Sequence, residues 1–145
     1  MGGGRERKAM AKTYRVGVIG HTGRGNYGHG IDEVWLHAPN VEIAAVADGD
    51  KKGLAATARK LGDVTAYVDY REMLERERPD LVAIGTRWID QHRDMAVAAV
   101  ESGAHVYMEK PFCRSMQEAD EIVAACERTH ANLAIAHTTR YSPMI

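Results

Sequence analysis

The chain has 145 residues, of which 45% are hydrophobic, and its formal net charge is -1 at pH 7. This length fits one domain, and the apolar share is enough for a packed core and too high for a disordered chain. The nearly balanced charge disfavours nucleic acid and anionic membranes as partners. Cys113 and Cys126 lack CxxC spacing, so we expect reduced thiols in a cytoplasmic protein, with neither a disulfide framework nor a metal site.

No apolar run approaches the ~20 residues that a membrane helix needs. Residues 1–12 are glycine-rich and basic, and they lack the apolar core of a secretory signal. We therefore expect a disordered tail over 1–12 and one folded domain over 13–145.

From Tyr14 onward, strand-like apolar runs alternate with helical patterns. We expect six strands, at 14–20, 42–47, 65–68, 81–85, 105–108 and 133–136. A glycine-rich segment and a helix over 31–38 follow the first strand, and a helix marked by Leu54, Ala58 and Leu61 follows the second. Helices at 70–76 and 91–102 follow the third and fourth strands, and a helix opened by the Ser115–Glu118 capping box follows the fifth. Six such strands predict an α/β fold with a doubly wound parallel sheet in three α/β/α layers. We expect the strand order 3-2-1-4-5-6.

The glycine-rich segment runs from Gly20 to Gly30. Within it, Gly23-x-Gly25-x-x-Gly28 matches the G-x-G-x-x-G fingerprint of a Rossmann dinucleotide-binding loop, between an expected strand and an expected helix. Glycines let the backbone approach a pyrophosphate, and a helix N-terminus offers free N–H groups. Gly20 ends the strand and could take the role of the first glycine, so the loop register stays open. A flexible glycine loop is the plain alternative.

Asp48 ends the second expected strand, about 20 residues after the fingerprint, where an acidic residue is expected. A carboxylate there accepts hydrogen bonds from both ribose hydroxyls and repels a 2′-phosphate, which favours NAD over NADP. An ordinary turn aspartate is the alternative, and Lys51 and Lys52 leave some room for NADP. Asn26 and Tyr27 lie inside the fingerprint, and we count them with its glycines as candidate cofactor contacts.

Glu109-Lys110-Pro111 follows the fifth expected strand. In a doubly wound sheet, the carboxyl ends of the strands face the ligand crevice. A lysine at this position can polarise or protonate an oxygen of a substrate. Without further context, such a turn is more often a solvated loop.

These pieces together resemble the N-terminal domain of the Gfo/Idh/MocA family, which includes glucose-fructose oxidoreductase and inositol dehydrogenase. The similar segments are Val16 to Gly28, VEIAAVAD ending at Asp48, PDLVAIGT ending at Thr86, GAHVYMEKPF from Gly103, and LAIAHTTRYSP over 133–143. The resemblance implies that the glycine loop holds the pyrophosphate of the cofactor and that Asp48 holds the adenosine ribose.

The resemblance also implies a nicotinamide side of the site. Thr86, the residues after it, and Glu109 would line this side, with Lys110 beside the reacting carbon as the catalytic residue. Arg140 falls where the family often has an arginine. Two features depart from the family: the glycine loop is longer than usual, and Arg87-Trp88 replaces a common Pro-Asn. His92 matches a frequent family histidine, although a plain helix-start histidine is equally compatible.

The function that the resemblance implies is hydride transfer between NAD and a hydroxyl-bearing carbon of a sugar or cyclitol. Family members carry a second domain that supplies most substrate contacts, and this chain stops at Ile145, where that domain would begin. A non-catalytic NAD-binding module and a truncated remnant are the alternatives. We expect a sugar-like small molecule as substrate, and a homo-oligomer is compatible with the sequence.

Overall fold

A computed structural model describes residues 11–144, so the expected tail lies almost wholly outside the described residues. The strands are β1 Tyr14–Gly20, β2 Val41–Asp48, β3 Thr65–Tyr67, β4 Leu81–Ile84, β5 His105–Met108 and β6 Leu133–Ile135. The helices are α1 Lys51–Lys60, α2 Tyr70–Glu77, α3 His92–Glu101 and α4 Met116–Thr129. Among the helices described, none combines the length and the apolar character that crossing a membrane requires.

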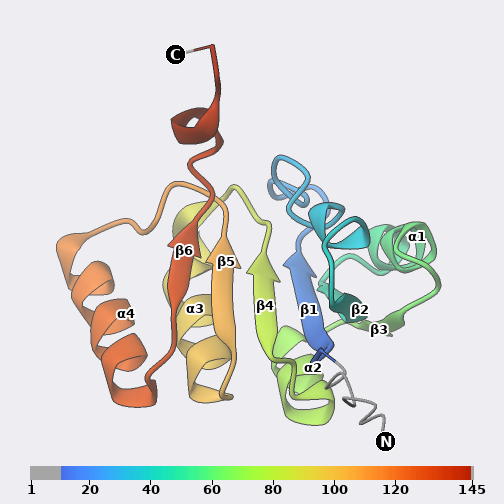
Figure 1. The fold of residues 1–145 in the computed structure, drawn as a ribbon, viewed down its shortest axis with the longest axis horizontal. Coiled ribbons are helices and arrows are strands. Elements are labelled where there is room, and N and C mark those ends of the chain that lie inside the picture. The colour runs from blue at the N-terminus through green and yellow to red at the C-terminus, as the bar shows by residue number, and fades with distance from the viewer. Residues whose placement is uncertain (1–10, 145) are drawn as a thin grey trace, which may run out of the picture.

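All six strands pair in parallel, in the order β3-β2-β1-β4-β5-β6. This order confirms the predicted doubly wound sheet. The order reverses between β1 and β4, so the chain leaves these two neighbouring strands in opposite directions across the sheet (Figure 1). Ligand crevices of open α/β sheets form at this point, outside the carboxyl ends of the strands.

Two apolar clusters cover the two faces of the sheet and complete the three layers. On one face, α2, α3 and α4 pack on the sheet through Met73, Leu74, Met95, Ala96, Ala99, Val100, Ile122 and Ala125. On the other face, α1 and the glycine-rich segment contribute Leu54, Ala58, Leu61, Tyr27 and Ile31. Figure 1 shows α3 behind β5 and β6, with α4 next to α3 beyond the edge of β6. Burial on both faces explains why the strands read as continuous apolar runs.

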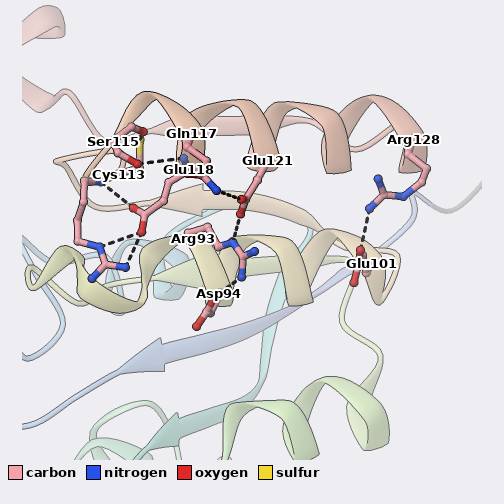
Figure 2. A network of polar contacts seen from close by, with 10 residues as sticks. Arg93, Asp94, Glu101, Cys113, Ser115, Gln117, Glu118, Glu121 and Arg128 are labelled. Carbon is pink, nitrogen blue, oxygen red and sulfur yellow. Dashed lines mark hydrogen bonds and ion pairs between the residues drawn. The ribbon is translucent and has the colours of Figure 1, made fainter.

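Polar side chains join α3 to α4 along their solvent side (Figure 2). Arg93 contacts Glu121, and Arg128 lies 2.7 Å from Glu101. The predicted capping box forms, because Ser115 Oγ accepts a hydrogen bond from the Glu118 N–H at 3.2 Å. Exposed ion pairs contribute little free energy each, so the apolar contacts beneath them account for most of the stability of this layer.

Residues 31–38 do not form the α-helix that their spacing predicts. Only Val34–Leu36 make a short 3-10 turn. Gly30 has a φ of 77°, so the segment begins as a turn. The indole N–H of Trp35 donates to the Ile31 carbonyl at 2.8 Å, and this oxygen would accept the Trp35 backbone N–H in an α-helix. The apolar spacing correctly marks buried side chains, but it does not specify the backbone.

We expect Met73→Ala to lower the free energy of unfolding by about 2–5 kcal/mol, because it leaves a cavity in the core. The Met73 side chain is 0% exposed, and its Cε lies 3.0 Å from the position of a Cβ built on Gly17. Met116→Ala is the matched control, since Met116 is 77% exposed. Chemical denaturation of both variants measures the difference. Equal stability of the two would contradict this description of the core.

Candidate functional site

A cavity of about 290 Å³ opens at the carboxyl ends of β1, β2 and β3. Its wall consists of strand ends, the turns that follow them and the first turns of α2 and α3: Ile19, Gly20, His21, Ala47, Asp48, Gly49, Val68, Asp69, Tyr70, Arg71, Gln91 and Met95. We call it the β1–β3 cavity. Of the residues predicted from the sequence, Gly20 and Asp48 line it.

A second, more open groove of about 530 Å³ lies between the glycine loop and the turns after β4 and β5. It is lined by Arg24, Arg87, Trp88, Ile89, Asp90, Pro111 and Arg114, and we call it the arginine groove. The glycine loop contributes to both spaces, as does the β4–α3 turn. The two spaces therefore adjoin along one loop and one turn, as the two halves of a dinucleotide site would.

The carboxylate of Asp48 binds the first part of the glycine loop. It is 1% exposed, and it accepts hydrogen bonds from the Thr22 N–H at 3.0 Å, the Thr22 hydroxyl at 2.6 Å and the Tyr27 hydroxyl at 2.8 Å. The Asp50 N–H adds a fourth donor at 2.9 Å. These donors occupy the acceptor positions of the carboxylate. A bond from Asp48 to a ribose stays a prediction, and it requires one of these donors to leave.

Gly20 is needed where it stands because the Tyr27 ring packs on it. A Cβ built on Gly20 would lie 2.2 Å from that ring. Burial, together with the neighbouring Asp48 carboxylate, raises the pKa of the Tyr27 phenol. The phenol therefore stays protonated and donates to Asp48 throughout the physiological range. Gly20 thus serves a contact within the protein.

A second buried carboxylate, that of Glu109, binds the far end of the glycine loop. Glu109 is 1% exposed, and its Oε2 accepts the His29 N–H at 2.9 Å. The Nδ1 of His29 lies 3.1 Å from the same oxygen. A Cβ built on Gly28 would lie 2.2 Å from this oxygen. A side chain at position 28 would therefore clash with Glu109. The two buried carboxylates thus bind the loop near both of its ends.

Gly25 packs against the turn after β4. A Cβ at Gly25 would lie 2.4 Å from the backbone nitrogen of Arg87, so Gly25 serves an internal contact too. Gly23 differs, because a Cβ there would meet nothing within 4 Å. Asn26 Oδ1 accepts the Gly23 N–H at 3.0 Å, which closes the loop on itself. The expected approach of a pyrophosphate to these glycines stays a prediction.

Thr86 and His92 lie just below the crevice. Thr86 is 3% exposed, and among the described residues no partner lies within hydrogen-bonding distance of its Oγ1. His92 is fully buried, and its ring nitrogens lie 2.6 Å from the Thr86 carbonyl oxygen and 2.7 Å from that of Pro111. His92 therefore joins the turns after β4 and β5 and lines neither space. The Thr86 hydroxyl is thus a buried polar group without a hydrogen-bond partner among the described residues.

Lys110 and Arg140 are both exposed. Lys110 directly follows the buried Glu109 and precedes Pro111, which lines the arginine groove. Arg140 lies in the 3-10 turn Thr138–Tyr141, on the segment that extends from β6 away from the sheet (Figure 1). The described fold brings Lys110 to the edge of the crevice and does not bring Arg140 to either space.

Sequence reasoning did not identify several residues that shape the site. Thr22 and His29 bind the two buried carboxylates, and Arg24 forms an ion pair with Asp90 at 2.5 Å. Thr22 and Arg24 are polar side chains inside a glycine-rich loop, and this position could have identified them as site residues from the sequence. Asp90 lies 66 positions from Arg24, and nothing in the sequence connects the two.

Comparisons with known proteins agree with this fold. The family model described as "Oxidoreductase family, NAD-binding Rossmann fold" matches residues 14–137. A glycosyl hydrolase family 109 protein of Shewanella pealeana is 33% identical over 141 residues, covering 89% of this chain and 29% of that protein. The D-apiose dehydrogenase of Paraburkholderia graminis is 32% identical over 111 residues, covering 77% of this chain and 29% of that enzyme.

Solved structures are similar in fold. An NAD-binding oxidoreductase from Klebsiella pneumoniae aligns with a TM-score of 0.76 at 30% identity, covering 92% of this chain and 36% of that one. The myo-inositol 2-dehydrogenase of Lactobacillus plantarum aligns with a TM-score of 0.79 at 23% identity, covering 91% and 38%. The chain thus spans less than a third of the curated relatives described above. It belongs to the Gfo/Idh/MocA oxidoreductase family and corresponds to that family's NAD-binding Rossmann domain.

Proposed function

We propose that this domain binds NAD for an oxidoreductase that transfers hydride to or from a hydroxyl-bearing carbon of a sugar or cyclitol. The observation that carries the proposal is the pair of adjoining spaces at the carboxyl edge of the sheet, on either side of the glycine loop. Relatives named D-apiose dehydrogenase and glycosyl hydrolase support a carbohydrate substrate. A cytoplasmic location and a homo-oligomeric assembly belong to the same proposal.

The residues of the site fit a dinucleotide. The β1–β3 cavity suits the adenosine half, because its wall combines strand ends with the side chains of Val68, Tyr70 and Met95. Among the described residues, the buried hydroxyl of Thr86 has no hydrogen-bond partner, and we propose that the cofactor supplies one. A buried hydroxyl without a partner costs free energy, and a ligand amide or hydroxyl would offset that cost.

In this proposal NAD supplies the hydride chemistry when it is bound, and the protein orients the reactants and manages the proton. Lys110 is the proposed catalytic residue, holding a proton at its Nζ next to the substrate oxygen. Its backbone N–H donates to Glu109 Oε1 at 3.1 Å. The carboxylate that binds the glycine loop therefore also orients the start of the Lys110 turn.

The described residues supply one wall of a reaction site. Orientation of reactants can contribute about 7–11 kcal/mol to catalysis, and it requires contacts on both sides of the substrate. We therefore propose that a second domain completes the site. A non-catalytic NAD-binding module is the second candidate function, and it is favoured by the exposure of Lys110 in this domain.

We expect NADH to bind at least about tenfold more tightly than NADPH, because the Asp48 carboxylate repels a nearby 2′-phosphate. Calorimetric titration of both cofactors measures this preference. Asp48→Asn keeps the shape of the side chain and removes its charge, so it should reduce the preference for NADH over NADPH. Asp63→Asn is the control, since Asp63 is exposed and lines neither space. Comparable affinity of the unaltered chain for NADPH would rule out this cofactor assignment.

For Lys110, we expect the 145-residue chain alone to bind NADH without appreciable turnover of inositol or glucose. In a fusion with a second domain of the family, Lys110→Ala should lower kcat by about 10²-fold or more, as loss of a general acid or base does. The Kd for NADH should change little. Lys12→Ala, at an exposed lysine that precedes β1 and pairs with Asp80, serves as control. An unchanged kcat in Lys110→Ala would remove Lys110 from the mechanism.

A further inference from the structure

We propose that Arg24 and Arg87 bind the pyrophosphate of the dinucleotide, and that Asp90 occupies Arg24 until the phosphates displace it. This inference rests on the proposed dinucleotide function. In this inference two side chains bind the negatively charged phosphates, whereas the fingerprint predicts that the loop backbone and a helix N-terminus bind them.

The usual source of phosphate binding is weak in this domain. No α-helix follows β1, because the segment after the glycine loop forms only the turn Val34–Leu36. Much of the loop backbone is also engaged within the protein. The N–H groups of Thr22, Gly23 and His29 already donate to side chains. Binding two phosphates therefore requires another source of positive charge.

Arg87 provides a guanidinium that, among the described residues, has no carboxylate partner. Its backbone packs on Gly25 of the glycine loop, and its Nε lies 3.4 Å from the Gly25 carbonyl oxygen. The side chain is exposed and lines the arginine groove. Among residues 11–144, no carboxylate lies within ion-pair distance of it.

Arg24 extends from the glycine loop itself and faces the turn after β4. Its guanidinium lies 2.5 Å from an Asp90 oxygen and 4.8 Å from the centre of the Trp88 ring. Asp90 belongs to the 3-10 turn Ile89–Gln91, whose last residue lines the β1–β3 cavity. The ion pair therefore joins the loop to the turn that separates the two spaces, where a bound dinucleotide would have to pass from one to the other.

The charges of the arginine groove match a diphosphate. Two guanidinium nitrogens of Arg114 donate to the same oxygen of Glu118, Oε1, at 2.8 and 2.5 Å, so Arg114 already has a carboxylate partner. The side chains of Arg24 and Asp90 are each 40% exposed, and such an exposed pair is weak. Guanidinium groups bind phosphate oxygens at two points. A diphosphate can therefore replace Asp90 at Arg24 and neutralise Arg87 as well.

The test measures binding of NADH, ADP and adenosine to the 145-residue chain by calorimetry. We expect Arg24→Ala and Arg87→Ala each to weaken NADH and ADP binding by about ten- to hundredfold, as loss of a charged hydrogen bond does. Adenosine, which has no phosphate, should bind these variants as it binds the unaltered chain. Arg128→Ala is the matched control, because Arg128 is an exposed, ion-paired arginine on α4.

Asp90→Asn tests the exchange. Freeing Arg24 should tighten NADH binding by up to about fivefold. The gain should vanish when Arg24→Ala is also present, since Asp90 acts through Arg24. Thermal unfolding of each variant confirms that the fold is retained.

The possible failures are distinguishable. Absence of NADH binding by the unaltered chain would contradict the proposed function, and the inference with it. Normal NADH binding by Arg24→Ala and Arg87→Ala would overturn the inference alone. Equal losses for adenosine and ADP would also overturn it, because they would indicate a structural role for the arginines. If Asp90→Asn tightens NADH binding even in the presence of Arg24→Ala, the proposed displacement of Asp90 from Arg24 by the phosphates is overturned.

Discussion

Two buried carboxylates hold the glycine loop, and the shape of the whole crevice depends on them. Asp48, at the end of β2, binds Thr22 and Tyr27, and Glu109, after β5, binds His29. Burying a carboxylate is unfavourable unless several donors surround it, so each of them fixes the groups that satisfy it. Because the two lie on either side of β1 and β4 in the sheet, the loop spans the point where the strand order reverses.

This arrangement changes the role of the loop glycines. In the usual interpretation they make room for a pyrophosphate, whereas Gly20, Gly25 and Gly28 make room for a ring, a backbone and a carboxylate of the same chain. Contacts within the chain thus pack the loop against its surroundings. A loop of this kind is organised in advance, which lowers the entropic cost of binding. In the proposed dinucleotide site, the side chains of Arg24 and Arg87, rather than the loop backbone, recognise the charge of the phosphates.

Much of the architecture follows from the sequence because short apolar runs and helix spacing specify buried faces directly. The strand order and the Ser115 cap are confirmed. The helix over 31–38 is wrong, since apolar spacing marks which side chains are buried but cannot foresee an indole that takes a backbone acceptor. The sequence also does not indicate which polar residues far apart in the chain contact one another. The fingerprint identifies Asp48 as important, but only the fold shows that three of its four donors come from the loop.

The Tyr27 ring, which occupies the space above Gly20, also bears on how such domains diverge and can be redesigned. A smaller residue at 27 would leave a void, and any side chain at 20 would expel the ring, so neither position can change alone at low cost. The same holds for Gly25 and the backbone of Arg87. Loop and turn thus form one packed unit. A transplant of the glycine loop into another Rossmann scaffold would have to carry the turn after β4 with it.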